Sequence, residues 1–126
     1  MKKLTYFLPA ILFYLLIFLL SSQDLDIDFK INHLDKVIHI FEFGLLGFLL
    51  AIGFFNALSF ASWTKSVLTF GSGLLLSVAD EVHQLFVPRR RSGFKDIVAD
   101  AAGLVFGILV FRYLVARRKP ARKKPR

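Results

Sequence analysis

Four long apolar segments dominate this sequence and restrict the folds that it can adopt. They cover residues 4–21, 34–55, 64–86 and 94–116. A helix needs about 20 mostly apolar residues to cross the hydrocarbon core of a bilayer, and 56% of the 126 residues are hydrophobic. The links between the segments are short, so consecutive helices must be antiparallel neighbours. The sequence therefore predicts an all-α protein, a four-transmembrane-helix bundle with short antiparallel connections.

The first apolar segment has a second interpretation as a secretory signal peptide, because it follows the basic start Met1-Lys2-Lys3. Its apolar run is longer than the core of a usual signal peptide, and no A-x-A cleavage site follows it. We therefore expect it to remain as a membrane span. Cysteine is absent from the chain, which excludes disulfides, thiolate catalysis and cysteine-based zinc sites.

Most of the net charge of +8 comes from residues at the C-terminal end. Seven Lys and Arg residues lie between residues 117 and 126, and the rest of the chain carries only +1. No aromatic side chain interrupts this tail, so it offers no platform for stacking nucleic-acid bases, and we expect no nucleic-acid partner. The tail either contacts anionic lipid or anchors the topology passively. The predicted domains are a membrane domain over residues 1–116 and a basic cytoplasmic tail over residues 117–126.

Lys and Arg near the ends of membrane spans tend to stay in the cytoplasm. One side of the predicted bundle holds the tail and four further cations, Lys2, Lys3, Lys65 and Arg112. The expected location is therefore the cell membrane, crossed several times, with both termini and the link 56–63 in the cytoplasm. The links 22–33 and 87–93 then face outward.

The same topology gathers the ionisable side chains at the outer face, where all nine carboxylates and all three histidines fall. A charge inside the bilayer costs at least ~2.5–3.5 kcal/mol on insertion scales, so such residues usually face a protein interior or a wet cavity. We therefore predict a polar site at the outer ends of the last three spans. Its predicted residues are Asp35, Lys36, His39, Glu42, Asp80, Glu81, Gln84, Arg90, Asp96 and Asp100.

The spacing of these residues suits helices that face one another. Positions i, i+4 and i+7 share one face of a helix, which is the spacing of Asp35, His39 and Glu42. Asp80 and Gln84 are four residues apart, as are Asp96 and Asp100. The stripe of Asp100 continues into Gly103 and Gly107, a small-residue motif that permits close helix contact. Gly44 and Gly47 are expected to act in the same way on the second span.

Four cations on the outer side, Arg89, Arg90, Arg91 and Lys95, run against the orientation rule. Pairing with the nearby carboxylates is the simplest reason for their position. An arginine can grip a phosphate or carboxylate through two hydrogen bonds. We therefore predict that Arg90 contacts an anion and that Asp96 orients it, in a pocket lined by Asp35, His39 and Glu81.

Three chemical uses of this polar layer compete. The first is binding of an anionic or amphiphilic ligand, and the second is catalysis, for which carboxylates and a histidine would supply a general acid and a general base. The third is metal binding by Asp35, His39, Asp80 and His83, which ranks lowest because no H-E-x-x-H or similar spacing supports it, so we expect no metal or other cofactor. The alternative to all three is a structural role, in which polar groups only hold helices together.

Two motifs in this chain resemble those of the VanZ-like membrane proteins. The first is Asp35-Lys36-x-x-His39 at the start of a glycine-containing span. The second is Asp80-Glu81-x-His83-Gln84-x-Phe86-x-Pro88, followed by Arg90, Asp96, Asp100, Gly103 and Gly107. Ser21-Ser22-Gln23 after the first span is also similar to the family pattern. The chain departs from that pattern at Arg89, where the family commonly has Gly, and at Asp100, where many members have Asn.

The resemblance covers residues 4–112 and implies a small integral membrane protein of the bacterial cell envelope, similar to one associated with teicoplanin resistance. The resemblance thus implies a cellular location, the cell envelope, and does not imply a particular reaction. The expected ligand is a glycopeptide, a lipid-linked cell-wall precursor or a lipid headgroup. A membrane-embedded hydrolase or transferase acting on lipid headgroups is the first alternative, and a structural or assembly protein without a ligand is the second.

Overall fold

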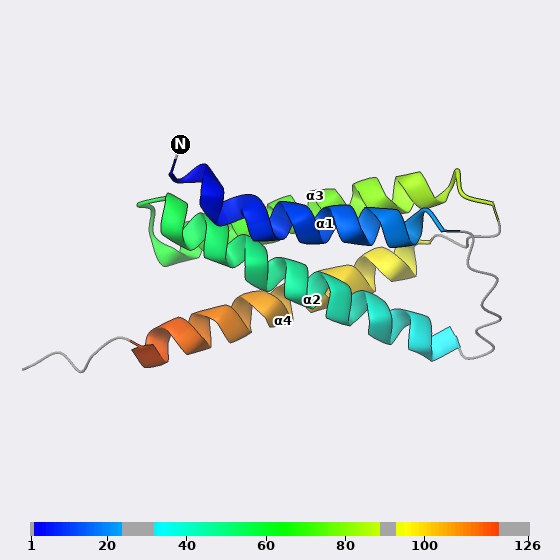
Figure 1. Cartoon of the computed structure of the whole chain (residues 1–126). Coiled ribbons are helices and arrows are strands. Elements are labelled where there is room, and N and C mark those ends of the chain that lie inside the picture. Colours follow the sequence, from blue (N-terminus) through cyan, green and yellow to red (C-terminus); the bar gives the residue numbers. More distant parts are fainter. Residues whose placement is uncertain (1, 24–31, 89–92, 119–126) are drawn as a thin grey trace, which may run out of the picture.

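The protein is built from helices, as the apolar segments predict. The computed structural model describes residues 2–23, 32–88 and 93–118, with the backbone alone at residues 32 and 33. A short 3-10 turn, η1 (Leu4–Phe7), leads into α1 (Leu8–Ser21), which is followed by α2 (Asn32–Ala57), α3 (Ser62–Gln84) and α4 (Phe94–Arg118). No strand occurs within these described ranges. Consecutive helices run antiparallel (Figure 1), which confirms the predicted all-α bundle with short connections.

Three of the helical segments are long and apolar enough to cross a membrane: Leu4–Ser21, Leu34–Ala57 and Phe94–Arg118. The helix α3 is not among them, although residues 64–86 are predicted to form a span. It has 23 residues, but Thr69, Ser77, Asp80, Glu81 and Gln84 all lie on its buried face. These five polar residues contribute to its low hydropathy, and they are turned into the bundle. Its crossing of the membrane stays a prediction.

The helices α2 and α4 make the most extensive contact in the bundle, and glycines allow their backbones to meet. A Cβ atom on Gly103 would strike the carbonyl oxygen of Ile40, and one on Gly107 would strike that of Gly44. A Cβ atom on Gly47 would lie 3.0 Å from the carbonyl oxygen of Leu104. The predicted small-residue contact between these two helices is therefore confirmed. It brings the polar starts of α2 and α4 close together.

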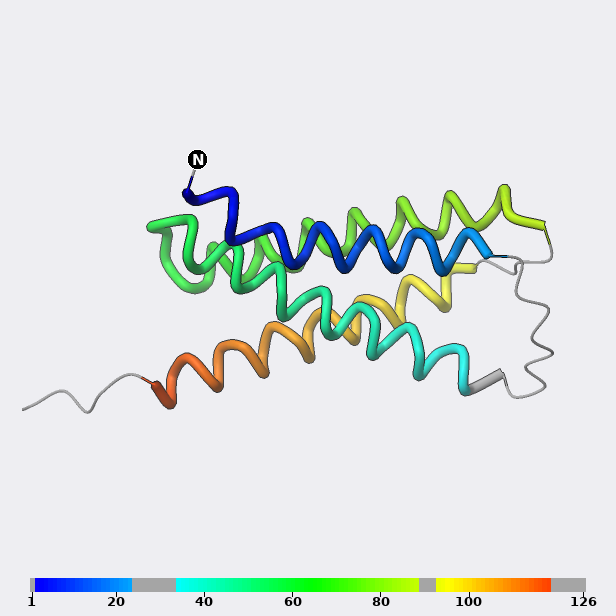
Figure 2. The backbone as a smooth tube through the Cα atoms, viewed as in Figure 1, coloured from blue at the N-terminus to red at the C-terminus, as the bar shows by residue number. Residues whose placement is uncertain are grey.

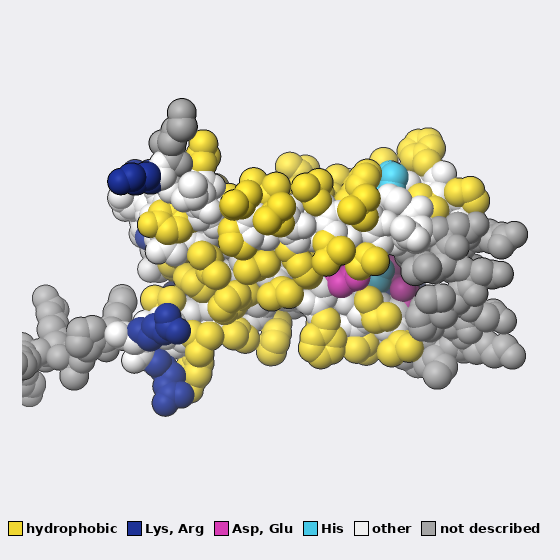
Figure 3. Space-filling view, viewed as in Figure 1, with side chains coloured by type: hydrophobic (Ala, Val, Ile, Leu, Met, Phe, Trp, Pro, Cys, Tyr) yellow, Lys and Arg dark blue, Asp and Glu magenta, His cyan; other side chains and the backbone are white. Residues whose placement is uncertain are grey.

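The two ends of the bundle differ. The first described residues and the end of α4 lie at one end of the molecule, and the starts of α2 and α4 lie at the other (Figures 1 and 2). On the face drawn in Figure 3, Lys and Arg side chains gather at the first end, whereas acidic and histidine side chains appear toward the second. On that face the surface between the ends is largely apolar. Leu12 on α1, Leu75 on α3 and Phe106 on α4 are among the exposed apolar side chains of the bundle.

The close contact of α2 and α4 can be tested by adding a methyl group. Gly107→Ala should lower the free energy of unfolding by about 1–3 kcal/mol, the usual cost of overpacking, because its Cβ atom meets backbone rather than a movable side chain. Gly71→Ala is the matched control, since no atom lies within 4 Å of its Cβ position. Unfolding in mixed micelles measures both. Equal stability of the two variants would contradict the packing described.

Candidate functional site

A cluster of buried polar side chains lies at the end of the bundle opposite the first described residues. It draws on the starts of α2 and α4 and on the end of α3. Asp100 is 0% exposed, Asp80 1% and His39 5%. The buried members of this polar cluster are His39, Asp80, Glu81, Gln84, Asp96 and Asp100. Four carboxylates buried in an apolar bundle need hydrogen-bond partners there, because hydrocarbon supplies none.

Asp100 on α4 is a central acceptor in the cluster. The Ser77 hydroxyl on α3 donates a hydrogen bond of 2.6 Å to Oδ2 of Asp100. Oδ1 lies 2.8 Å from Nδ1 of His39 on α2. A carboxylate accepts here, so Nδ1 carries the proton in this hydrogen bond. One carboxylate thus connects three helices and fixes the orientation of the His39 ring.

Asp80 on α3 makes the equivalent connection to α1. The Ser21 hydroxyl donates a hydrogen bond of 2.6 Å to Oδ1 of Asp80. The Gln84 side-chain amide, one turn further along α3, donates one of 2.9 Å to Oδ2. His83 makes a second connection between α3 and the end of α1. Its Nε2 lies 2.8 Å from Oγ of Ser22, and its ring stacks on the ring of Phe18 with the two ring centroids 4.2 Å apart.

The outer edge of the cluster is charged and partly exposed. The Lys36 ammonium donates a hydrogen bond to Oδ1 of Asp96, and it lies 3.8 Å from Oδ2 of Asp35. Oδ1 of Asp35 lies 3.9 Å from Nε2 of His39. The side chains of Lys36 and Asp35 are 35% and 43% exposed, whereas that of Asp96 is 6% exposed. We call Asp35 and Lys36 the rim of the cluster.

The family model for VanZ/LLP1 matches residues 2–116 of the chain. The chain belongs to the VanZ/LLP1 family. No curated protein and no solved structure matches it. The family match confirms the resemblance inferred from the two motifs, and three apolar helices agree with a membrane protein. It assigns no ligand and no reaction to the polar cluster.

Most of the site residues predicted for this VanZ/LLP1 chain lie together at one end of the bundle. The structure brings together Asp35, Lys36, His39, Asp80, Glu81, Gln84, Asp96 and Asp100. Glu42 is partly buried and lies three residues beyond His39 on α2. Arg90 lies outside the described residues, so its predicted contact with Asp96 stays a prediction. Asp96 itself contacts Lys36.

Sequence reasoning missed the serines that satisfy the buried carboxylates. Ser77 lies three residues before Asp80, and the buried face of α3 continues back through Gly73 and Thr69 in steps of four. Extending that stripe from Asp80 would have found Ser77. In the sequence, Ser21 is identified only as part of the family pattern. Its partner Asp80 lies 59 positions later in the chain, and no sequence pattern links two residues that far apart on different helices.

Two sets of side chains in the described part of the chain could hold a metal ion. The ligand atoms of Asp35, His39 and Asp96 lie within 4.8 Å of one another, and so do those of His39, Glu81 and Asp100. His39 belongs to both sets. The first set includes the partly exposed Asp35, whereas the second set is completely buried.

The role of the buried serines can be tested on α3 alone. Ser77→Ala removes a hydrogen bond to a carboxylate that is 0% exposed, so it should lower the free energy of unfolding by about 1–3 kcal/mol. Ser72→Ala on the same helix is only partly buried and should change stability by less than about 0.5 kcal/mol. Reversible unfolding in mixed micelles compares the two. If the two variants cost the same, Ser77 does not support Asp100.

Proposed function

We propose that this VanZ/LLP1 chain is a multi-pass membrane protein of the bacterial cell envelope whose polar cluster binds an anionic ligand. The ligand class is the headgroup of an envelope lipid, a lipid-linked cell-wall precursor or a glycopeptide. The observation that carries this proposal is the meeting of ionisable side chains from three helices at one end of an apolar bundle. Ionisable residues at membrane depth are a sign of a functional site because they are costly to place there.

The arrangement of the cluster favours binding over a purely structural role. Asp80 and Asp100 are satisfied by side chains inside the bundle, and these hydrogen bonds hold helices together. The rim differs, since Asp35 and Lys36 remain partly exposed beside the buried acids. Helix packing alone does not require an accessible cation at that point. The interior therefore acts as a rigid support and the rim as the contact surface.

The charge of the ligand follows from the cations at this end. Lys36 is held between Asp35 and Asp96, and Lys95 is exposed at the start of α4. Arg89, Arg90 and Arg91 directly precede α4 in the sequence. Clustered Lys and Arg recognise phosphate and carboxylate groups. Arg90 is our proposed main anion contact, oriented by Asp96.

We further propose that the polar cluster faces the outside of the cell. Lys2, Lys3, Lys65 and Arg112 lie with Arg117 and Arg118 at the opposite end, which the positive-inside tendency assigns to the cytoplasm. Trp63 and Tyr113 are exposed near that end, at 74% and 60%, as aromatic residues at a membrane interface usually are. The basic tail of residues 117–126 would then contact anionic lipid of the inner leaflet.

One observation favours a second candidate, an enzyme acting on lipid headgroups. Asp100 bonds Nδ1 of His39, and Nε2 faces the partly exposed rim. A histidine oriented in this way by a buried carboxylate can act as a general base. The substrate would be the same class of envelope lipid, so recovery of altered lipid distinguishes this candidate from binding.

The binding proposal predicts ligand-dependent stabilisation that requires the outer cations. Phosphatidylglycerol, a polyprenyl-linked cell-wall precursor and teicoplanin are added separately to the purified full chain in detergent, and the thermal unfolding midpoint is measured. At least one should raise the midpoint of the wild type. Arg90→Ala should weaken that binding by about tenfold or more, because it removes a charge-assisted hydrogen bond.

Lys65→Ala is the matched control, because Lys65 is a cation at the other end of the bundle that donates a hydrogen bond to the carbonyl oxygen of Phe55. It should bind as the wild type does. Stabilisation that survives Arg90→Ala would remove Arg90 from the site. Absence of stabilisation by all three probes would leave the structural or assembly role, and chemically altered lipid recovered after incubation would favour the enzyme.

A further inference from the structure

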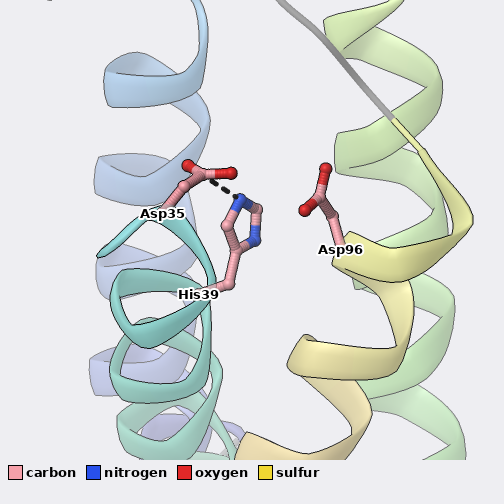
Figure 4. Close-up of side chains that lie close together, drawn as sticks. All are labelled: Asp35, His39 and Asp96. Atoms are coloured by element: carbon pink, nitrogen blue, oxygen red, sulfur yellow. Dashed lines mark ion pairs between the residues drawn. The ribbon is translucent and has the colours of Figure 1, made fainter. Parts of the chain in front are cut away.

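We propose that Asp35, His39 and Asp96 form a binding site for a divalent transition-metal ion, with Asp100 as the positioning residue for His39. The ligand atoms of the three residues lie within 4.8 Å of one another. Figure 4 shows the Asp35 and Asp96 carboxylates flanking the His39 ring, with Asp35 and His39 from α2 and Asp96 from α4. Imidazole nitrogen and carboxylate oxygen together suit an ion such as Zn²⁺ or Mn²⁺.

The second ring nitrogen of His39 points to this site. His39 is only 5% exposed, and its Nε2 lies 3.9 Å from Oδ1 of Asp35, which is within ion-pair distance but beyond hydrogen-bond distance (Figure 4). An ion that binds both atoms at ~2.0–2.2 Å, at the angles of a tetrahedral or octahedral site, separates them by roughly 3–3.6 Å. The observed separation is a few tenths of an ångström longer, and Asp35, whose side chain is 43% exposed, needs to move only by that amount to share an ion with His39.

The hydrogen bond between His39 and Asp100 is of the type that usually orients a metal-binding histidine. Such a histidine usually donates its other ring N–H to a carboxylate, which fixes the tautomer and the ring orientation. Here Nδ1 of His39 lies 2.8 Å from Asp100, and Ser77 donates a hydrogen bond of 2.6 Å to the other oxygen of that carboxylate. When the imidazole is neutral with its proton on Nδ1, the lone pair of Nε2 is directed at the rim.

Charge favours a divalent cation at this position. When the imidazole is neutral, as a metal ligand must be, the formal charges of Asp35, Asp96, Asp100 and Lys36 sum to −2, and Asp96 and Asp100 are buried. Burial of uncompensated charge is costly, and one divalent ion would neutralise this group. Lys36 contacts one oxygen of Asp96 and approaches one oxygen of Asp35, so each carboxylate keeps a second oxygen for the ion.

The rim gives such an ion access and leaves room for a further ligand. The Asp35 side chain is 43% exposed, whereas the alternative set of His39, Glu81 and Asp100 is fully buried and includes the carboxylate that already bonds His39. Three protein ligands with an open position are typical of metal sites that also bind a substrate oxygen. The metal site is independent of the proposed lipid ligand, since an ion can bind where no headgroup does.

Metal content measured in detergent, without added lipid, tests this inference separately from the proposed function. The full chain, purified without a polyhistidine tag and stripped with a chelator, is equilibrated with Zn²⁺ or Mn²⁺, and bound metal and affinity are measured. The wild type should bind one ion per chain. His39→Gln and Asp35→Asn should each weaken binding by about tenfold or more, and Asp100→Asn should weaken it by about 10–100-fold.

The matched control is His83→Gln, because His83 bonds Ser22 and lies outside the proposed ligand set. It should bind the ion as the wild type does. Asp35→Asn changes a partly exposed side chain, so it reports on the site even where His39→Gln fails to fold. Binding that is unchanged in Asp35→Asn, or no binding by the wild type, would overturn the proposal. An equal loss in His83→Gln and His39→Gln would also overturn it.

Discussion

Hydrocarbon offers no hydrogen-bond partner, so each carboxylate buried in this bundle must be satisfied by the bundle itself. Asp80 and Asp100 meet this requirement through side chains of other helices, with Ser21 of α1 serving Asp80 and with His39 and Ser77 serving Asp100. These hydrogen bonds join all four helices at one end. The positions of the remaining polar side chains depend on them, because the ring of His39 is oriented by Asp100.

The close approach of α2 and α4 makes this arrangement possible. Gly103 and Gly107 remove the Cβ atoms that would meet the backbone of α2, and His39 and Asp100 lie within hydrogen-bond distance close to that contact. The contact is apolar and structural, whereas the polar cluster beside it is accessible at the rim formed by Asp35 and Lys36. The same helix pair thus supplies a rigid support and an exposed, charged edge.

Much of this architecture could be predicted from the sequence, because apolar segment length and the four-residue spacing of Asp35, His39, Asp80 and Gln84 depend only on helix geometry. Pairings between helices could not be predicted in the same way. The contacts of Ser21 with Asp80 and of Lys36 with Asp96 join residues about 60 positions apart, and they depend on how the helices rotate and cross. The partners of the polar residues on α3 are a further example, because Ser77 bonds Asp100 of α4 and Asp80 bonds Ser21 of α1.

The most direct test is the position of the polar end relative to the membrane. The chain has no cysteine, so single-cysteine variants at the exposed positions Leu34, Leu85 and Ser59 can be labelled in intact cells with a membrane-impermeant maleimide. We expect labelling from outside at Leu34→Cys and Leu85→Cys, and labelling at Ser59→Cys only after lysis. Labelling of the first two variants from opposite sides of the membrane would contradict a single outward-facing polar end.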